Sequence, residues 1–143
     1  MTTEGNGIAR MEQETVVHKL SDWLLRQPGP SKPYVEAVTG PTEGFNIEGT
    51  FAGKPIYVLC SGGPLNEREG TEEWATLDGI MAKALSMMEA YREDIWLAVP
   101  NSPAFEAAAR SAAANLELAK PWQAIALVGP GGQVRFIQRP KTA

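Results

Sequence analysis

The only cysteine of the chain, Cys60, stands at the end of the apolar run "KPIYVLC" and is the first candidate for chemistry. A thiol becomes a nucleophile when a neighbouring base lowers its pKa, and the only histidine that could do so is His18. On a helical wheel His18 lies opposite the apolar stripe of its segment, so we expect it to face solvent. Strand alternation groups Cys60 with Ile56 and Val58. We therefore predict a buried structural thiol at position 60.

The glycine pair that follows, Gly62 and Gly63, lies where a phosphate-binding loop would lie, between a strand and a helix. Residues 60–70 have neither the GxxxxGK[ST] nor the GxGxxG spacing of such loops. A phosphatase-type loop would need an arginine six residues after the cysteine, where this chain has Asn66. One cysteine and one histidine also fall short of a standard zinc site and of a serine-histidine-aspartate triad. We expect no metal and no cofactor at these positions.

Composition limits the classes of function further. The chain has 143 residues, 13 Lys and Arg against 17 Asp and Glu, and a net charge of −4. Strong nucleic-acid binding draws on a basic patch, so this balance disfavours a nucleic-acid partner without excluding it. A single cysteine rules out an internal disulfide, and no signal peptide or membrane-spanning run is present. We expect a cytoplasmic protein with no membrane association.

Apolar periodicity and turn residues predict a single α/β domain over residues 11–138, with a mobile tail at 1–10 and a short tail at 139–143. A helix begins at Met11 and ends before the proline-rich residues 27–33. Three strands with short connections then predict an antiparallel meander, at 33–39, 45–51 and 54–61. The remaining elements complete the order αβββαβαββ: a helix over 71–92, a strand over 94–100, a helix over 102–118, and a hairpin over 122–138.

Residue types within these elements refine the prediction. Strand 55–61 and the run 94–100 are apolar on both faces, which predicts central strands of a mixed sheet flanked by the helices 71–92 and 102–118. Ser102 before Pro103 is typical of a helix N-cap. The long helix has an apolar stripe that is typical of a core, although it could also form a groove for a partner: Trp74, Leu77, Met81, Leu85, Met88 and Tyr91. A flavodoxin-like parallel sheet is an alternative for residues 55–128, but the initial meander argues against it.

The element order, with its meander after the first helix, resembles the restriction-endonuclease-like, or PD-(D/E)XK, superfamily over residues 11–138. In active members an aspartate on the second strand and a Glu-x-Lys on the third bind Mg²⁺ and position water. The family's spacing, counted from Asn46, places Leu59 at the glutamate position and Ser61 at the lysine position. None of the three supplies a carboxylate or a cation, so the resemblance implies a degenerate site.

A carboxylate site could instead have migrated within the same scaffold. Glu36 and Glu48 stand on the first two strands, and Glu14 could contribute from the first helix. Solvated glutamates on edge strands are the commoner explanation of this pattern.

The sequence therefore leaves three functions open. The first is a non-catalytic interaction or regulatory module that binds a partner protein. The second is a divergent Mg²⁺-dependent nuclease that uses the migrated carboxylates. The third is a small acidic export chaperone, although the final helix usual in such chaperones is not evident here.

Overall fold

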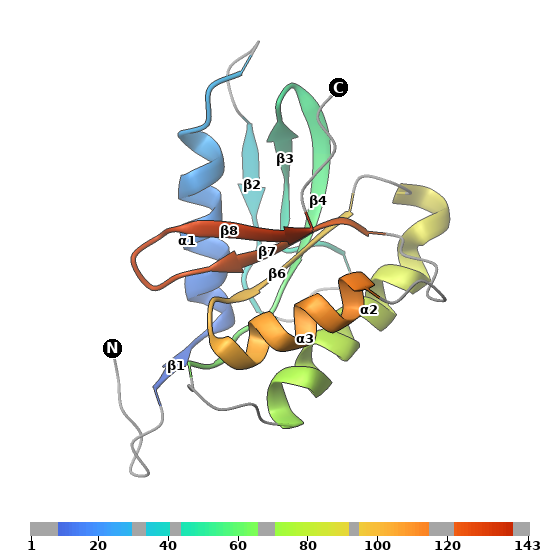
Figure 1. Ribbon diagram of the computed structural model, residues 1–143. Coiled ribbons are helices and arrows are strands. Elements are labelled where there is room, and N and C mark those ends of the chain that lie inside the picture. The colour runs from blue at the N-terminus through green and yellow to red at the C-terminus, as the bar shows by residue number, and fades with distance from the viewer. Residues whose placement is uncertain are drawn as a thin grey trace.

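The computed structural model describes residues 9–29, 34–40, 44–65, 71–91, 95–114 and 122–138. Outside these residues lie positions 1–8 of the tail predicted over 1–10, the tail predicted over 139–143, and the end of the helix predicted over 102–118. Figure 1 labels the elements, whose bounds are β1 Arg10–Met11, α1 Gln13–Leu25, β2 Val35–Ala37, β3 Ile47–Phe51, β4 Lys54–Cys60, β5 Gly63–Pro64, α2 Thr71–Tyr91, β6 Ile95–Pro100, α3 Pro103–Ala114, β7 Trp122–Val128 and β8 Val134–Gln138.

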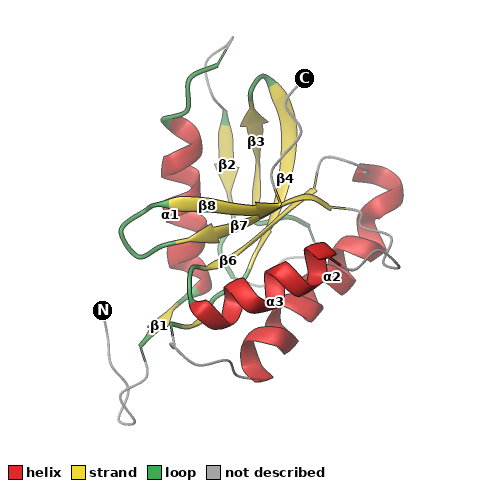
Figure 2. Cartoon of the chain, in the orientation of Figure 1, coloured by secondary structure: helices red, strands yellow, loops and turns green. Residues whose placement is uncertain are grey.

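Six strands form one mixed sheet in the order β2-β3-β4-β6-β7-β8, which confirms the α/β class (Figure 2). Strands β2, β3 and β4 pair antiparallel, as do β7 and β8, whereas β4, β6 and β7 pair parallel. The predicted meander and C-terminal hairpin are both present. The β3–β4 turn is tight because Ala52 and Gly53 both have positive φ, 53° and 80°.

The helices cover the sheet from two sides (Figure 1). Both α2 and α3 connect parallel strands, and such crossovers are right-handed, so two in the same direction place their helices on one face. A buried apolar cluster joins these helices to Leu59, Leu97 and Leu127 of the sheet. The first helix, α1, packs on the opposite face with Val58 and Cys60. Helices α2 and α3 therefore share one face of the central strand instead of flanking it.

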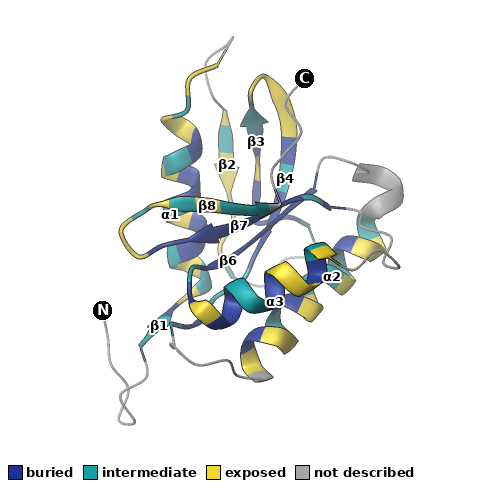
Figure 3. Cartoon of the chain, viewed as in Figure 1, coloured by how far each residue is buried: buried dark blue, intermediate teal, exposed yellow. Residues whose placement is uncertain are grey.

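Alternation along the central strands explains both layers of the core. Every residue of β6 is buried, with Trp96 on the α1 face and its neighbours Ile95 and Leu97 on the α2–α3 face (Figure 3). On the α1 face the Trp96 ring makes edge contacts with Phe51 and Phe136, at centroid distances of 5.0 and 5.3 Å. The two apolar layers enclose the end of β4, where Leu59 and Cys60 lie.

The long helix α2 is rotated relative to the stripe expected from sequence. Leu77 and Ala84 are buried, but Trp74 and Leu85 are 36% and 37% exposed. Glu73 is buried instead, and its Oε2 has no hydrogen-bond partner among the described residues. Part of the apolar stripe faces α3, so Trp74 and Met81 lie at the boundary between α2 and α3. The side chains of Met88 and Tyr91 lie outside the described residues.

A second, two-stranded sheet was not expected from the sequence. Arg10 pairs with Pro64 and Met11 with Gly63, so β1 precedes α1 and the helix begins only at Gln13. Arg10, which we assigned to the N-terminal tail, thus belongs to a strand. This small sheet ties the start of the described chain to the segment that leaves β4.

Candidate functional site

The three positions that the family resemblance singled out lie side by side at the C-terminal end of β4. The backbone N–H of Asn46 donates to the Val58 carbonyl at 2.9 Å, and the side-chain Oδ1 of Asn46 accepts the Cys60 N–H at 3.0 Å. The next backbone donor along β4, the Ser61 N–H, bonds to the Ala98 carbonyl of β6 at 3.0 Å. Asn46 is thus bonded to Val58 and Cys60, the residues on either side of Leu59, and Ser61 follows Cys60 in the chain.

Asn46 uses both ends of its amide to join backbone segments. While Oδ1 accepts from Cys60, Nδ2 donates to the Val38 carbonyl at 3.1 Å and reaches the Gly40 carbonyl at 3.5 Å. Gln13 of α1 joins the same network, because its Oε1 accepts the Gly40 N–H at 2.8 Å. Asn46 is only 4% exposed, so these bonds satisfy a buried polar group. The hydrogen bond between Gln13 and Gly40 was not expected, and no pattern in the sequence predicts it.

Leu59 and Cys60 point to opposite faces of the sheet. Leu59 is 1% exposed in the apolar cluster beneath α2 and α3. Cys60 is 4% exposed on the α1 face with Ile56 and Val58, and burial raises the pKa of its thiol. His18 is exposed on α1. The predicted burial of the cysteine is confirmed, and a thiol held protonated in this way is a poor nucleophile.

The three glutamates of the alternative site are separated by the sheet. Glu36 of β2 lies directly opposite Glu48 of β3 in the antiparallel register, and both side chains are exposed. Their neighbour Ile47 points into the cluster on the α1 face, so the two glutamates point the other way. Glu14 is exposed on α1, which covers that first face. The structure therefore pairs Glu36 with Glu48 but leaves Glu14 on the far side.

Tyr34 lies beside this carboxylate pair. Its pKa is raised, first by a hydrogen bond with Glu36 and further by burial and by the charges of Glu36 and Glu48. Tyr34 and Val38, at the two ends of β2, are each 51% exposed. We call Tyr34, Glu36, Val38 and Glu48 the acidic edge, because the first three lie in or next to the outer strand β2 and Glu48 lies opposite Glu36 on the neighbouring strand β3.

A groove runs between α2 and α3. It encloses about 110 Å³, and its apolar walls include Trp74, Met81 and Ala108. Asp78 adds a carboxylate to the lining. The groove explains why Trp74 stays partly exposed, since it is a wall of the groove and not a core residue.

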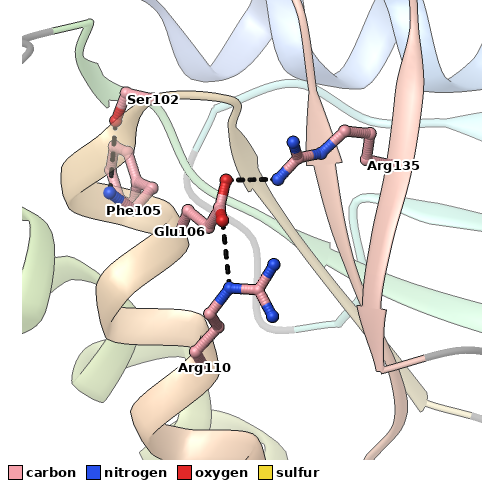
Figure 4. Close-up of polar contacts among 5 residues, drawn as sticks. All are labelled: Ser102, Phe105, Glu106, Arg110 and Arg135. Atoms are coloured by element: carbon pink, nitrogen blue, oxygen red, sulfur yellow. Dashed lines mark hydrogen bonds and ion pairs between the residues drawn. The ribbon is translucent and has the colours of Figure 1, made fainter.

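Two ion-paired glutamates fasten elements together away from these positions. Glu106 of α3 bonds to Arg110 at 3.0 Å and also to Arg135 of β8 (Figure 4), and these two arginines hold its pKa below the ordinary value. Ser102 caps the same helix, with its Oγ accepting the Phe105 N–H at 3.2 Å, as predicted. Glu72 of α2 pairs with Arg10 of β1 at 2.6 Å, which lowers the pKa of Glu72. Both pairs are structural links.

Within the described residues, no three histidine, cysteine or acidic side chains come close enough together to hold a metal ion. The helices of that part of the chain include none that is both long enough and apolar enough to span a bilayer. Comparison with protein families, with curated proteins and with solved structures found no match to this chain.

Proposed function

We propose that this protein is a non-catalytic interaction module on a restriction-endonuclease-like scaffold and that it binds a partner protein. The connectivity supports the scaffold part of the proposal. After α1, three antiparallel strands lead through α2 to β6, which pairs parallel with β4. This is the order that the resemblance implies, and the α3, β7 and β8 elements extend the same sheet.

The observation that carries the proposal is that two of the three positions matched to the family motif, Asn46 and Leu59, make structural contacts. Asn46 spends both ends of its amide on backbone groups, and Leu59 is buried among apolar side chains. Phosphodiester hydrolysis of the family's type needs anionic ligands for Mg²⁺ and a cation or metal for the developing charge. Asn46 and Leu59 instead stabilise the fold at the place where an active member would hold its metal.

Surface chemistry supports a protein partner over a nucleic acid. The acidic edge presents two carboxylates with no cation in salt-bridge contact among the described residues, which opposes binding of phosphates. Exposed apolar side chains, Trp74 and Leu85 on α2 and Tyr34 and Val38 around β2, are typical of surfaces that bury against another protein.

A divergent nuclease is the second candidate, favoured by the direct pairing of Glu36 with Glu48. Two neighbouring carboxylates can bind Mg²⁺. Against this, both are exposed, and Glu14, the third expected member, lies beyond the opposite face.

One experiment separates the two candidates. The protein is titrated with Mg²⁺ and Mn²⁺ by calorimetry and incubated with single-stranded, duplex and branched DNA and RNA. We expect neither saturable metal binding nor cleavage. Divalent-dependent cleavage that Glu48→Ala abolishes and the matched variant Glu14→Ala retains would establish the nuclease and overturn the proposal.

The binding half of the proposal is tested separately. Proteins captured by the immobilised chain from a lysate of its source are purified and titrated against it. We expect at least one to bind saturably as a pure component. Failure of every captured protein to bind when purified would contradict a protein-binding role.

A further inference from the structure

The strand β2 is an outer strand of the sheet, and no other strand of the described residues pairs with its free side. Tyr34 and Val38 exchange backbone hydrogen bonds with β3: the Thr50 N–H donates to the Tyr34 carbonyl at 3.0 Å, and the Val38 N–H donates to the Asn46 carbonyl at 2.7 Å. In an antiparallel ladder alternate residues bond to the neighbouring strand and the others point away. Val35 and Ala37 therefore direct their backbone N–H and C=O groups outward, where no backbone group of the described residues bonds to them.

The opposite edge of the sheet is guarded. Arg135 of β8 is held in an ion pair with Glu106, and the β7–β8 register is irregular at Ile125 and Ala126. Charged side chains and irregular pairing are devices that keep further strands from adding to a sheet edge. The two edges differ, so the exposure of β2 is not a general property of this sheet.

A single charged residue such as Glu36 on an edge strand would disfavour the addition of another strand, but Glu36 has a second carboxylate beside it. Glu48 lies directly opposite it on the same face, and like charges at directly opposed positions destabilise a strand pair. Lys54, at the far end of the β3–β4 hairpin, pairs with Phe51 in the ladder and makes no ion pair with either glutamate. A cation between the two carboxylates would relieve this repulsion.

We propose that β2 is a docking edge for an extended segment of a partner protein that adds as a further strand and places a lysine or arginine over Glu36 and Glu48. The segment's backbone bonds to Val35 and Ala37, and its flanking side chains lie against Tyr34 and Val38. The inference rests on the proposed function only in taking the partner to be a protein.

The chemistry of the acidic edge selects this occupant over two others. A second copy of the chain that paired centrally through β2 would set Glu36 against the same residue of its partner, which adds to the repulsion. A nucleic-acid strand would bring phosphates to the carboxylates and has no peptide groups to complete the ladder.

The probe for the test is an acetylated and amidated nonapeptide of alternating threonine and valine with lysine at its centre. This alternation puts the lysine on the Glu36 face and the valines on the Val35 and Ala37 face. Affinity is measured by fluorescence anisotropy, and the contact is mapped from backbone amide shifts of the full chain. We expect saturable binding below about 1 mM. The amides of Val35 and Ala37 should shift, and those of Trp74 and Met81 in the α2–α3 groove should not.

Two sets of matched variants separate charge from backbone pairing. Replacing the central lysine by glutamate, or Glu36 and Glu48 together by glutamine, should weaken binding by about tenfold, because a pair of opposite charges becomes like or neutral. Ala37→Pro removes an outward N–H but no bond to β3, and should abolish binding, whereas Ala37→Val keeps the donor and should bind normally. N-methylation of the peptide's valines should also abolish binding.

Several results would overturn the docking proposal: no saturable binding, equal affinity for the lysine and glutamate peptides, shifts confined to the α2–α3 groove, or a dimer in solution that Ala37→Pro dissociates. None of these results would show nuclease activity. Conversely, divalent-dependent cleavage would overturn the proposed function and leave the peptide measurement intact, so the two failures can be told apart.

Discussion

A single amide accounts for much of the difference between this site and a metal-binding one. Asn46 must donate to the Val38 carbonyl and accept from the Cys60 N–H, and its amide offers both groups within one short side chain at pH 7. An ionised aspartate has the same shape but only accepts. An aspartate, which the proposed scaffold would require at this position in an active member, is therefore a residue that this particular fold would tolerate poorly.

Asn46→Asp should lower the free energy of unfolding at pH 7 by about 2–3 kcal/mol, because a buried carboxylate would face the Val38 carbonyl. Chemical denaturation of the variant and the wild-type protein measures this difference. The deficit should shrink as the pH falls from 7 toward about 4, because burial beside a carbonyl raises the pKa of this carboxyl group in the folded state, where it takes up a proton and can donate again.

Asn101→Asp is the matched control, because the Asn101 side chain makes no hydrogen bond with the described residues and the position is only partly buried. Its effect should stay within about 0.5 kcal/mol. Equal losses in both variants would show that the Asn46 network contributes nothing specific.

At the scale of elements, the glycine pair after β4 is a packing device. A Cβ at Gly62 would lie 2.5 Å from the Met11 carbonyl oxygen and also against the Gln13 nitrogen, both backbone atoms. A Cβ at Gly63 would lie 2.6 Å from the buried Phe105 ring of α3. The pair therefore lets the end of β4 pass between the β1–α1 junction and α3, which is a sufficient reason for two glycines without a phosphate.

Gly62→Ala should destabilise the protein by about 1–3 kcal/mol, because the clashing atoms belong to backbone that cannot move aside. Gly79→Ala on the exposed side of α2 meets nothing within 4 Å and should stabilise it by about 0.5–1 kcal/mol. Thermal denaturation of both variants makes the comparison. A neutral Gly62→Ala would mean that the β4–β5 connection can shift away from α1.

For the whole molecule, two ion-paired glutamates couple stability to pH. The pKa of Glu72 is lowered mainly by its bond to Arg10, and that of Glu106 mainly by its bond to Arg110 and then by Arg135. A carboxyl group whose pKa is lower in the folded state contributes stability that is present above its ordinary pKa. That contribution is lost as the pH falls through the lowered value. Both links should therefore weaken in acid.

Glu106→Gln should lower stability at pH 7 by at most about 1 kcal/mol, since exposed ion pairs are screened by solvent. The difference from wild type should disappear near pH 2, where Glu106 is protonated in both states. Denaturation curves at several pH values test this. Glu14→Gln, which removes an exposed carboxylate outside any described ion pair, is the control, and an equal loss of stability at pH 7 would contradict the assignment.

Local patterns in the sequence were enough to determine the element types and the alternation of the central strands. The burial of Cys60 with Ile56 and Val58 follows from a period of two along β4, and the Ser102 cap follows from one residue and its neighbour. A tight turn joins β3 and β4 and sets their register. This register places Asn46, just before β3, beside the end of β4 that contains Leu59.

Tertiary structure alone decided which distant residues meet. The strands β1 and β5 are too short to carry a pattern, and the rotation of α2 depends on how α3 packs against it. The alternation of side chains along β2 and β3 is compatible with Glu36 and Glu48 on one face of the sheet. The packing of α1 on the opposite face, which no local pattern shows, separates Glu14 from them. Periodicity describes one element at a time, whereas the side of a sheet that a helix covers is set by long-range burial of apolar surface.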